Sequence, residues 1–566
     1  NRTISPNLHQ VYSILQACRS KAFHVPEFEP FYLDMSHRIR HGGAAAVGYE
    51  KEDIFSVFVR AKSMLTHVYS FLPSDLGGGA MLDAATDDAI YVWPTSSIHI
   101  FTNGSWSSIN TIDDQWGNLY AGIRAANIFL ESYQGDFPDN QYNVDYEEQM
   151  KQYRYYPYEA RFLRAFFYFE LIKRYKNVPL VEKTLEIEDV NELLQTDYEV
   201  MTDFISSECD AIKDHLPVNY NDVPGKEVGR ITKGAVLALK SRVLLYAASP
   251  LHNPTNDKEK WLKAAKAAKE LIDLSEAGGW YQIINEEVVN NPDAKGLILQ
   301  RMEGNSNVFE STNFPVGYEG GNTGMCPSEN LMEAFEMIDG TTFDFNNPKH
   351  VESMYDVNSR DPRLFKTMLY NGATWKGETV ESYQGGKNGY PRNGASKTSY
   401  YLKKYLKESV NLTTGSATSE RHVWVIFRYA EIFLNYAEAL NEAYGPEYTG
   451  GEFSLSAKDA LNKIRQRVGM PLLTSLSQDA FREKVRNERR VEFAFEGQRF
   501  WDIRRWKIGD RTNVIYGLEI EKGVDGAFEY KRVLVEPRKW EDKMYIYPIA
   551  NTERFKNVNL VQNPGW

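Results

Sequence analysis

The densest set of ionisable side chains lies at residues 487–506, whose sequence is NERRVEFAFEGQRFWDIRRW. Glu488, Glu492 and Asp502 alternate there with arginines and large aromatic side chains. Such a set suits one of two chemistries, acid–base catalysis by carboxylates or ion pairing at a packed interface. Arginine stays protonated and favours ion pairs, and a buried charge is costly unless it is paired. We therefore expect this segment to be structural, with its charges paired.

Short motifs for phosphate or metal binding are incomplete. Residues 372–379 (GATWKGET) have two glycines at phosphate-loop spacing, but Glu378 occupies the position that requires lysine. His37 and His41 are four residues apart with no third ligand near them, and residues 339–344 lack the spacing of a calcium loop. Neither a G-x-S-x-G elbow nor an H-E-x-x-H zinc motif occurs in the sequence. We expect no catalytic residue, no bound metal and no cofactor.

Aromatic residues in turn-rich segments offer a different chemistry, because the apolar C–H faces of sugars pack on aromatic rings. Residues 73–108 and the Gly/Asn-rich stretch at 317–324 are two such segments. We predict that five side chains in and beside these segments meet in a shallow aromatic platform: Tyr91, Trp93, Trp106, Phe314 and Tyr318. The next candidates are Trp375 and Tyr383. Hydrogen bonds to sugar hydroxyls are expected from the amides of Asn103, Asn313 and Asn322.

The elements that must position these residues are mainly amphipathic helices. Apolar residues recur at three- and four-residue steps, and each first helix is followed by a Pro/Gly-rich break and a second helix. The pattern is that of tetratricopeptide-type helix pairs. Three pairs are predicted at residues 159–175 with 198–215, 233–248 with 261–274, and 428–444 with 457–468, and a fourth begins at 116–133. We predict an all-α, mostly helical fold in which helix exceeds strand several-fold.

Residues 278–420 have a different composition, rich in Gly, Asn, Ser, Thr and Tyr, which favours turns over helices. We therefore expect two regions packed on one scaffold. The first, residues 1–275, carries helical repeats, and the second, residues 276–566, includes the loop-rich insert at about 278–420. Long loops held on a rigid scaffold are where binding usually takes place.

Composition excludes several classes of protein. The net charge of −12 argues against nucleic-acid binding, which depends on Lys and Arg. No stretch approaches the roughly 20 apolar residues that span a bilayer. The chain begins at Asn1 without Met, so we expect a processed or trimmed chain. Its three cysteines, Cys18, Cys209 and Cys326, lack metal-ligand spacing and are expected to be buried small hydrophobes.

The segment at 488–506 resembles the signature of the SusD/RagB family, E-R-x-x-E-(L/F)-x-F-E-G-x-R-x-x-D-(L/I)-x-R-W. Further family-like blocks follow the expected order and span most of the chain. They are YEARFLRAFFYFELIKRYKNVPLV at 158–181, GRITKGAVLALKSRVLLYAASP at 229–250, RDPRL at 360–364, LNKIRQRVGMP at 461–471 and the terminal NLVQNPGW. The chain departs from the pattern at Lys176, where a glycine is usual, and at Ala550, where a second proline is common.

The resemblance implies a single α-helical unit with four tetratricopeptide-type pairs and a variable loop-rich region. It also implies a lipid anchor, upstream of Asn1 in this sequence, that holds the protein on the outer-membrane surface of Bacteroidetes. Family members sit as a lid on a SusC-like TonB-dependent transporter and bind a nutrient, usually a glycan, without cleaving it. We expect a non-enzymatic glycan-binding protein whose repeat scaffold, rather than its loops, faces the transporter.

Two alternatives stay open, a glycoside hydrolase on a helical scaffold and a tetratricopeptide-type scaffold that binds peptides. A hydrolase needs a carboxylate pair at a defined separation in a cleft. One further expectation concerns the chain end, where Leu560, Val561 and Trp566 make the last nine residues apolar enough to dock on the fold.

Overall fold

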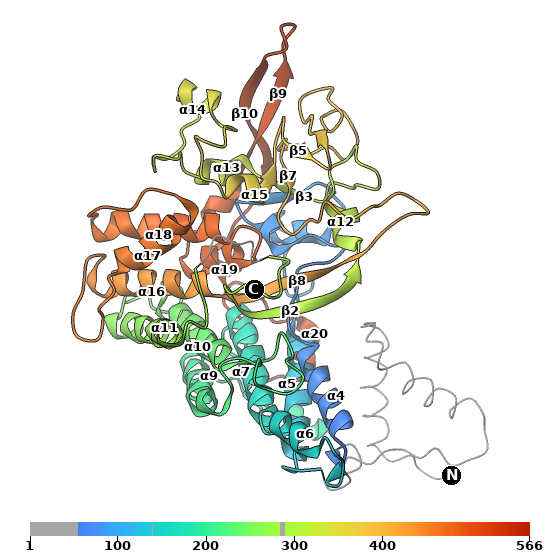
Figure 1. Ribbon diagram of the computed structural model, residues 1–566, viewed down its shortest axis with the longest axis vertical. Helices are drawn as coiled ribbons and strands as arrows, with labels where there is room; N and C mark the ends of the chain where they lie inside the picture. The colour runs from blue at the N-terminus through green and yellow to red at the C-terminus, as the bar shows by residue number, and fades with distance from the viewer. Residues whose placement is uncertain (1–54, 138–139, 284–288) are drawn as a thin grey trace.

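The computed structural model describes residues 55–137, 140–283 and 289–566. Cys18, His37 and His41 lie outside these ranges. Helix makes up 42% of the structure and strand 12%, which confirms the predicted excess of helix. Helices line the lower and left parts of Figure 1, and the loop-rich region lies above them. One continuous hydrophobic core extends from Phe55 to Leu560.

The helical scaffold contains all the predicted pairs. The pairs are α7 with α9, α10 with α11, and α16 with α17, while α5 packs between α4 and α7. Contacts of α9 with α10, and of α11 with α16, join successive pairs into one array (Figure 1). The bounds are α4 Phe58–Tyr69, α5 Trp116–Ser132, α6 Tyr146–Tyr153, α7 Tyr156–Tyr175, α8 Ile187–Val190, α9 Tyr198–Ile212, α10 Lys233–Ala248, α11 Lys258–Gly278, α16 Tyr429–Tyr444, α17 Ala457–Val468, α18 Gln478–Glu492, α19 Gln498–Arg505 and α20 Asn551–Lys556.

Local sequence explains where these helices begin and end. The Asp257 carboxylate accepts a hydrogen bond from the Glu259 N–H and caps α11, and the Ser456 hydroxyl caps α17 in the same way. Gly279, with φ of 65°, ends α11 in the left-handed region that glycine enters without strain. Lys176 ends α7 with φ of 67°, so a non-glycine residue adopts a positive φ where the family usually has glycine.

Strands form only two-stranded antiparallel ribbons among the described residues. The two long ribbons, β2 with β8 and β9 with β10, are features that the helical periodicity did not predict. The hairpin of β9 and β10 projects from the top of the molecule (Figure 1). The strands are β1 Ala89–Tyr91, β2 Leu297–Ser306, β3 Met325–Pro327, β4 Met368–Leu369, β5 Thr374–Trp375, β6 Glu378–Thr379, β7 Tyr401–Leu402, β8 Glu420–Arg428, β9 Val514–Lys522 and β10 Phe528–Pro537. Short helices lie between them: α12 Val308–Asn313, α13 Glu329–Ala334, α14 Pro348–Glu352 and α15 Leu364–Thr367.

The charges of the signature segment are paired with opposite charges, as predicted, except that of Arg504, whose guanidinium lies 3.5 Å from the centre of the Phe500 ring and donates to the Phe500 carbonyl at 3.0 Å. The buried Glu492 carboxylate accepts hydrogen bonds from Arg428 (2.6 Å), Arg363 (2.9 Å) and Arg467 (2.5 Å). Arg499 binds both carboxylate oxygens of Asp87, at 2.8 and 2.7 Å, and so ties α19 to the first loop. These ion pairs join α15, β8, α17, α18 and α19, so the segment holds the fold together. Cys209 and Cys326 are free and buried, which confirms the expectation for these two.

The C-terminal tail is docked, as expected. The Trp566 indole N–H donates to the carbonyls of Lys543 (3.1 Å) and Ile546 (2.8 Å), and its ring lies 4.8 Å from that of Trp106. Leu560 is buried, but Val561 is 72% exposed, so its predicted part in docking is wrong. A valine in an extended segment points either inward or outward, and only the packing decides which.

Deletion of residues 562–566 is expected to lower the melting temperature by several degrees. The deletion removes the Trp566 ring contact and its hydrogen bonds, and burial of one large side chain contributes about 1–3 kcal/mol. Thermal unfolding followed by circular dichroism measures the change. Val561→Ala, which alters an exposed residue of the same tail, should melt like the parent. An unchanged melting curve for the deletion would show that the tail adds no stability.

Candidate functional site

Two loops far apart in the sequence meet beside Trp93. Strand β1 pairs with β3, which places Tyr91 opposite Met325. Just beyond β1, the Trp93 indole N–H donates to the Asn322 carbonyl at 2.8 Å. The first loop and the central loop are therefore held together, as the sequence predicted.

A third loop, residues 383–394, completes this surface. Asn388 is fully buried within it and links it to the central loop, since its amide donates to the Val316 carbonyl at 2.7 Å. Gly389 makes the tight fold of the loop possible, because a Cβ there would lie 1.9 Å from the Tyr383 carbonyl oxygen. Gly394 lies against the Trp93 ring, where a Cβ would come within 3.1 Å of it. The backbone thus supports the indole from one side.

The accessible aromatic rings of this surface are Trp93 and Tyr390. Trp93 is half-buried and oriented by its hydrogen bond, while Tyr390 is 69% exposed. The exposed side chains of Asn322 and Arg392 lie on the same two loops. We call Trp93, Tyr390, Asn322 and Arg392 the Trp93–Tyr390 site. Two accessible rings on loops that also carry an exposed amide and an exposed guanidinium suit a hydroxylated ligand that has apolar faces.

Most of the predicted platform is not accessible, and that part of the prediction is wrong. Trp106 is 2% exposed, and its ring packs against those of Phe101, Tyr547 and Trp566. Tyr91 is 8% and Phe314 1% exposed. A ring without an open face cannot stack on a sugar. Turn-rich sequence does not distinguish a ring that anchors a loop from one that the loop displays.

Tyr318 and Trp375 also anchor loops. The Tyr318 hydroxyl donates to the Trp375 carbonyl at 3.3 Å, and the Lys387 ammonium lies 4.5 Å from the centre of the Tyr318 ring. Burial raises the pKa of Tyr318 to about 12. Trp375 is 1% exposed, so this second-choice candidate is buried too, whereas Tyr383 is half-buried.

The three predicted amides have different surroundings. Asn313 is buried, and its carbonyl accepts the Met325 N–H at 2.9 Å, so its function is structural. Asn103 is exposed and binds Ser105 of its own turn. Asn322 lies beside Trp93, where its side chain reaches solvent. Sequence reasoning missed Tyr390, although its position between glycines in GYPRNG was a usable signal.

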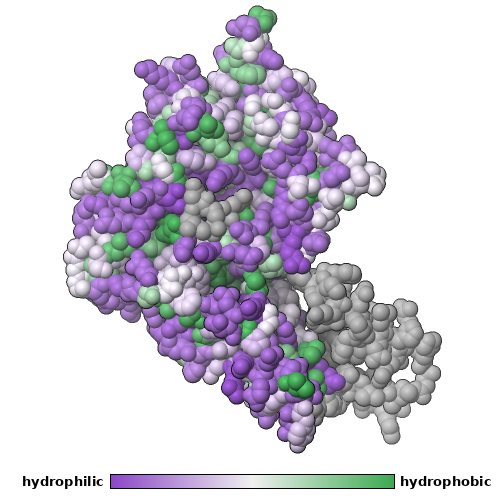
Figure 2. All heavy atoms as spheres, viewed as in Figure 1, coloured by the Kyte–Doolittle hydropathy of each residue, from purple (hydrophilic) through white to green (hydrophobic). Residues whose placement is uncertain are grey.

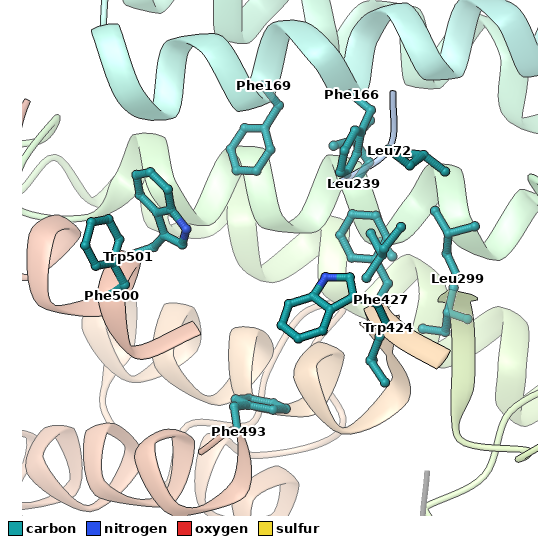
Figure 3. Close-up of a cluster of buried hydrophobic side chains, with 14 of the residues drawn as sticks. Leu72, Phe166, Phe169, Leu239, Leu299, Trp424, Phe427, Phe493, Phe500 and Trp501 are labelled. Carbon is teal, nitrogen blue, oxygen red and sulfur yellow. The ribbon is translucent and has the colours of Figure 1, made fainter. Parts of the chain in front are cut away.

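A cavity of about 510 Å³ lies between α5, α7, β8 and α19. Phe166 of α7 and Trp424 of β8 line it, and both belong to the cluster of buried hydrophobic side chains in Figure 3. Three of its acidic groups, Asp113, Glu170 and Glu496, form ion pairs. The fourth, Asp75, accepts a hydrogen bond from the Leu82 N–H at 2.8 Å instead, and burial raises its pKa to about 7. Burial alone would raise the pKa of Glu170, but Lys173 and Arg174 lower it to about 2. An ion-paired carboxylate does not provide the proton donor that a glycosidase requires, whereas a carboxyl with a raised pKa, such as that of Asp75, can.

In the described ranges, no helix is long and apolar enough to cross a membrane. The same residues contain no cluster of three or more histidine, cysteine or acidic side chains that could hold a metal ion.

The fold and the site define a class, a helical-repeat protein that displays a binding surface on interlocked loops. The chain belongs to the SusD/RagB family. A model described as the SusD family matches residues 287–566, and a model described as "Starch-binding associating with outer membrane" matches residues 51–245. Together they span most of the chain.

Individual relatives agree with this assignment. SusD-like protein P25 of Formosa agariphila is 23% identical over 433 residues, which are 70% of this chain and 71% of that protein. A SusD-like protein of Bacteroides fragilis is 28% identical with a TM-score of 0.76, over 91% of this chain and 98% of that one. A second B. fragilis structure, named a SusD-like carbohydrate binding protein, is 27% identical with a TM-score of 0.71, over 90% and 100%.

Proposed function

We propose that this protein captures a glycan at the Trp93–Tyr390 site on the cell surface, without cleaving it. The observation that carries the proposal is the pair of accessible rings on loops that hydrogen bonds hold in place. Pre-formed aromatic surfaces bind sugars at little cost in ordering. The family model described as starch-binding and the solved carbohydrate-binding neighbour support a glycan as the ligand.

The test is native affinity electrophoresis in gels that contain laminarin, starch, xylan, mannan or pectin. Laminarin is included because a neighbour of the same fold, 22% identical with a TM-score of 0.61, is named a laminarin-binding SusD-like protein. Retardation in at least one gel is expected. Incubation with the same polysaccharide should release no reducing ends, whereas their release would favour the hydrolase alternative. Absence of retardation in every gel, with peptide binding instead, would favour the peptide-scaffold alternative.

We also propose that the protein delivers its ligand to a SusC-like TonB-dependent transporter while a lipid anchor upstream of Asn1 holds it at the outer membrane. The description of the matching family model, which associates it with the outer membrane, supports this location. Stacked helices offer a broad rigid surface for a protein partner. Because the Trp93–Tyr390 site lies on the loops, we expect the transporter to dock on the helical scaffold.

Cross-linking in native outer membranes tests the orientation. A photo-cross-linker at Val59 of α4 or Val200 of α9, both exposed on the scaffold, should yield adducts with the transporter. The same group at Tyr390 should yield few. Adducts that form only from residues 278–420 would contradict this arrangement.

A further inference from the structure

A second set of partly exposed aromatic rings lies along the β9–β10 hairpin, and of its members only Tyr383 was a candidate from the sequence. The set is a continuous series of ring contacts, and none of its members is fully buried. Phe365 contacts Tyr370 (5.7 Å between ring centres), Tyr370 stacks on Tyr355 (4.4 Å), Tyr355 contacts Tyr530 (5.8 Å), Tyr530 contacts Phe528 (6.4 Å) and Phe528 contacts Tyr383 (5.3 Å). We call these six residues the aromatic ladder.

The ladder has features that core packing does not require. Phe528 is 36% exposed on a hairpin that projects from the molecule, and Figure 2 shows hydrophobic side chains on this projection. Among the described residues, the hydroxyls of Tyr370 and Tyr383 accept and donate no hydrogen bond, so both are free for a ligand. The Lys522 ammonium lies 5.1 Å from the Tyr383 ring centre and 5.8 Å from that of Phe528, and it adds a hydrogen-bond donor beside them.

The ladder is held rigidly and is continuous with the Trp93–Tyr390 site. The Gln384 N–H donates to the Ile520 carbonyl at 2.8 Å, and the Leu518 N–H donates to the Thr398 carbonyl at 3.1 Å. These bonds attach the loop that follows Tyr383 to the outer edge of β9. The same loop displays Tyr390, whose carbonyl accepts the Gly385 N–H at 2.7 Å. One loop therefore carries a ring of each surface.

We propose that the aromatic ladder binds further sugar residues of a glycan chain whose first residues occupy the Trp93–Tyr390 site. The centres of successive ladder rings lie between 4.4 and 6.4 Å apart, and all six side chains are at least partly exposed. The ligand is accordingly an extended oligosaccharide or polysaccharide rather than a mono- or disaccharide. This inference rests on the proposed function and specifies in addition how long the glycan ligand is.

The experiment is titration calorimetry with a length series of oligosaccharides, prepared from the polysaccharide that retards the parent protein. Phe528→Ala and Tyr370→Ala are each expected to bind the longest oligosaccharides about 2- to 12-fold more weakly than the parent, the range set by typical ring-contact energies. Both variants should bind disaccharides as the parent does. The matched control is Tyr444→Ala, which removes an exposed ring that stacks on Tyr448 at 4.2 Å in the scaffold.

Each outcome decides the proposal. Weaker binding that is confined to long oligosaccharides supports the ladder. Parent-like binding of all lengths by both variants overturns it. If Trp93→Ala still loses affinity, the proposed function stands. Equal loss for short and long ligands also overturns it, because the rings then only support the 383–394 loop. If no polysaccharide binds the parent protein, the proposed function fails, and the ladder with it.

Discussion

Replacing Glu492 by glutamine is expected to lower the free energy of unfolding by about 3–5 kcal/mol, the usual cost of breaking a buried ion pair from one side. The Glu492 side chain is almost fully buried and compensates three guanidinium groups, those of Arg363, Arg428 and Arg467. Glutamine keeps the shape but removes the charge, which leaves Arg467 without a carboxylate partner among the described residues. Denaturant unfolding followed by circular dichroism measures the loss.

The matched control for this prediction is Glu483→Gln. Glu483 lies on the same helix and pairs with Arg486 and Arg511, but its side chain is 54% exposed. Exposed ion pairs contribute about 0–1 kcal/mol, so this variant should unfold almost like the parent. Equal effects of the two substitutions would contradict the structural role of the buried network.

The pH dependence of the Glu492 effect follows from its pKa. Burial alone would raise the pKa, but Arg467, Arg428 and Arg363 hold it well below the ordinary glutamate value. As the pH falls, the unfolded chain therefore binds a proton at Glu492 before the folded chain does. The contribution of Glu492 to the free energy of unfolding is complete above the pKa of an ordinary glutamate and is lost as the pH falls below that pKa. The stability difference between parent and variant should narrow in that acidic range.

Replacing Trp93 by alanine is expected to weaken glycan binding by about 5- to 150-fold, which corresponds to roughly 1–3 kcal/mol for the loss of one large aromatic contact. Trp93 is the ring that two loops orient, through the Asn322 carbonyl, which accepts its indole N–H, and through the close approach of Gly394. Tyr390→Ala should also weaken binding, since Tyr390 is the most exposed ring of the site. Affinity electrophoresis, then calorimetry with the retarding polysaccharide, measures both.

Trp280→Ala is the control for this binding experiment. Trp280 is a 41% exposed tryptophan that follows α11, on the scaffold, so its loss should leave affinity unchanged. Melting curves must match among all variants, because misfolding would also abolish binding. If Trp93→Ala and Tyr390→Ala fold and bind like the parent, the glycan site lies elsewhere on the protein.

Local sequence was sufficient for the helical scaffold. Periodic apolar residues predicted the helices α7, α10 and α16, and caps such as Ser456 define where a helix starts. The expectation that these three helices are amphipathic was wrong, because the array of neighbouring helices buries each of them on nearly all sides. Periodicity and caps act within a few residues of one another, so they do not depend on the rest of the fold. The ion pairing of residues 488–506 was predictable for a related reason, because the cost of an unpaired buried charge applies in any fold.

Which aromatic rings reach solvent was decided by tertiary structure alone. Trp106 is buried because Trp566, at the other end of the chain, packs on it. Tyr390 is exposed on the loop that Asn388 joins to the Val316 carbonyl. The aromatic ladder depends on hairpin β9–β10 lying beside Tyr355 and Tyr383. Burial of a side chain is a sum over contacts with residues distant in sequence, and no local pattern of turn formers and aromatics contains that information.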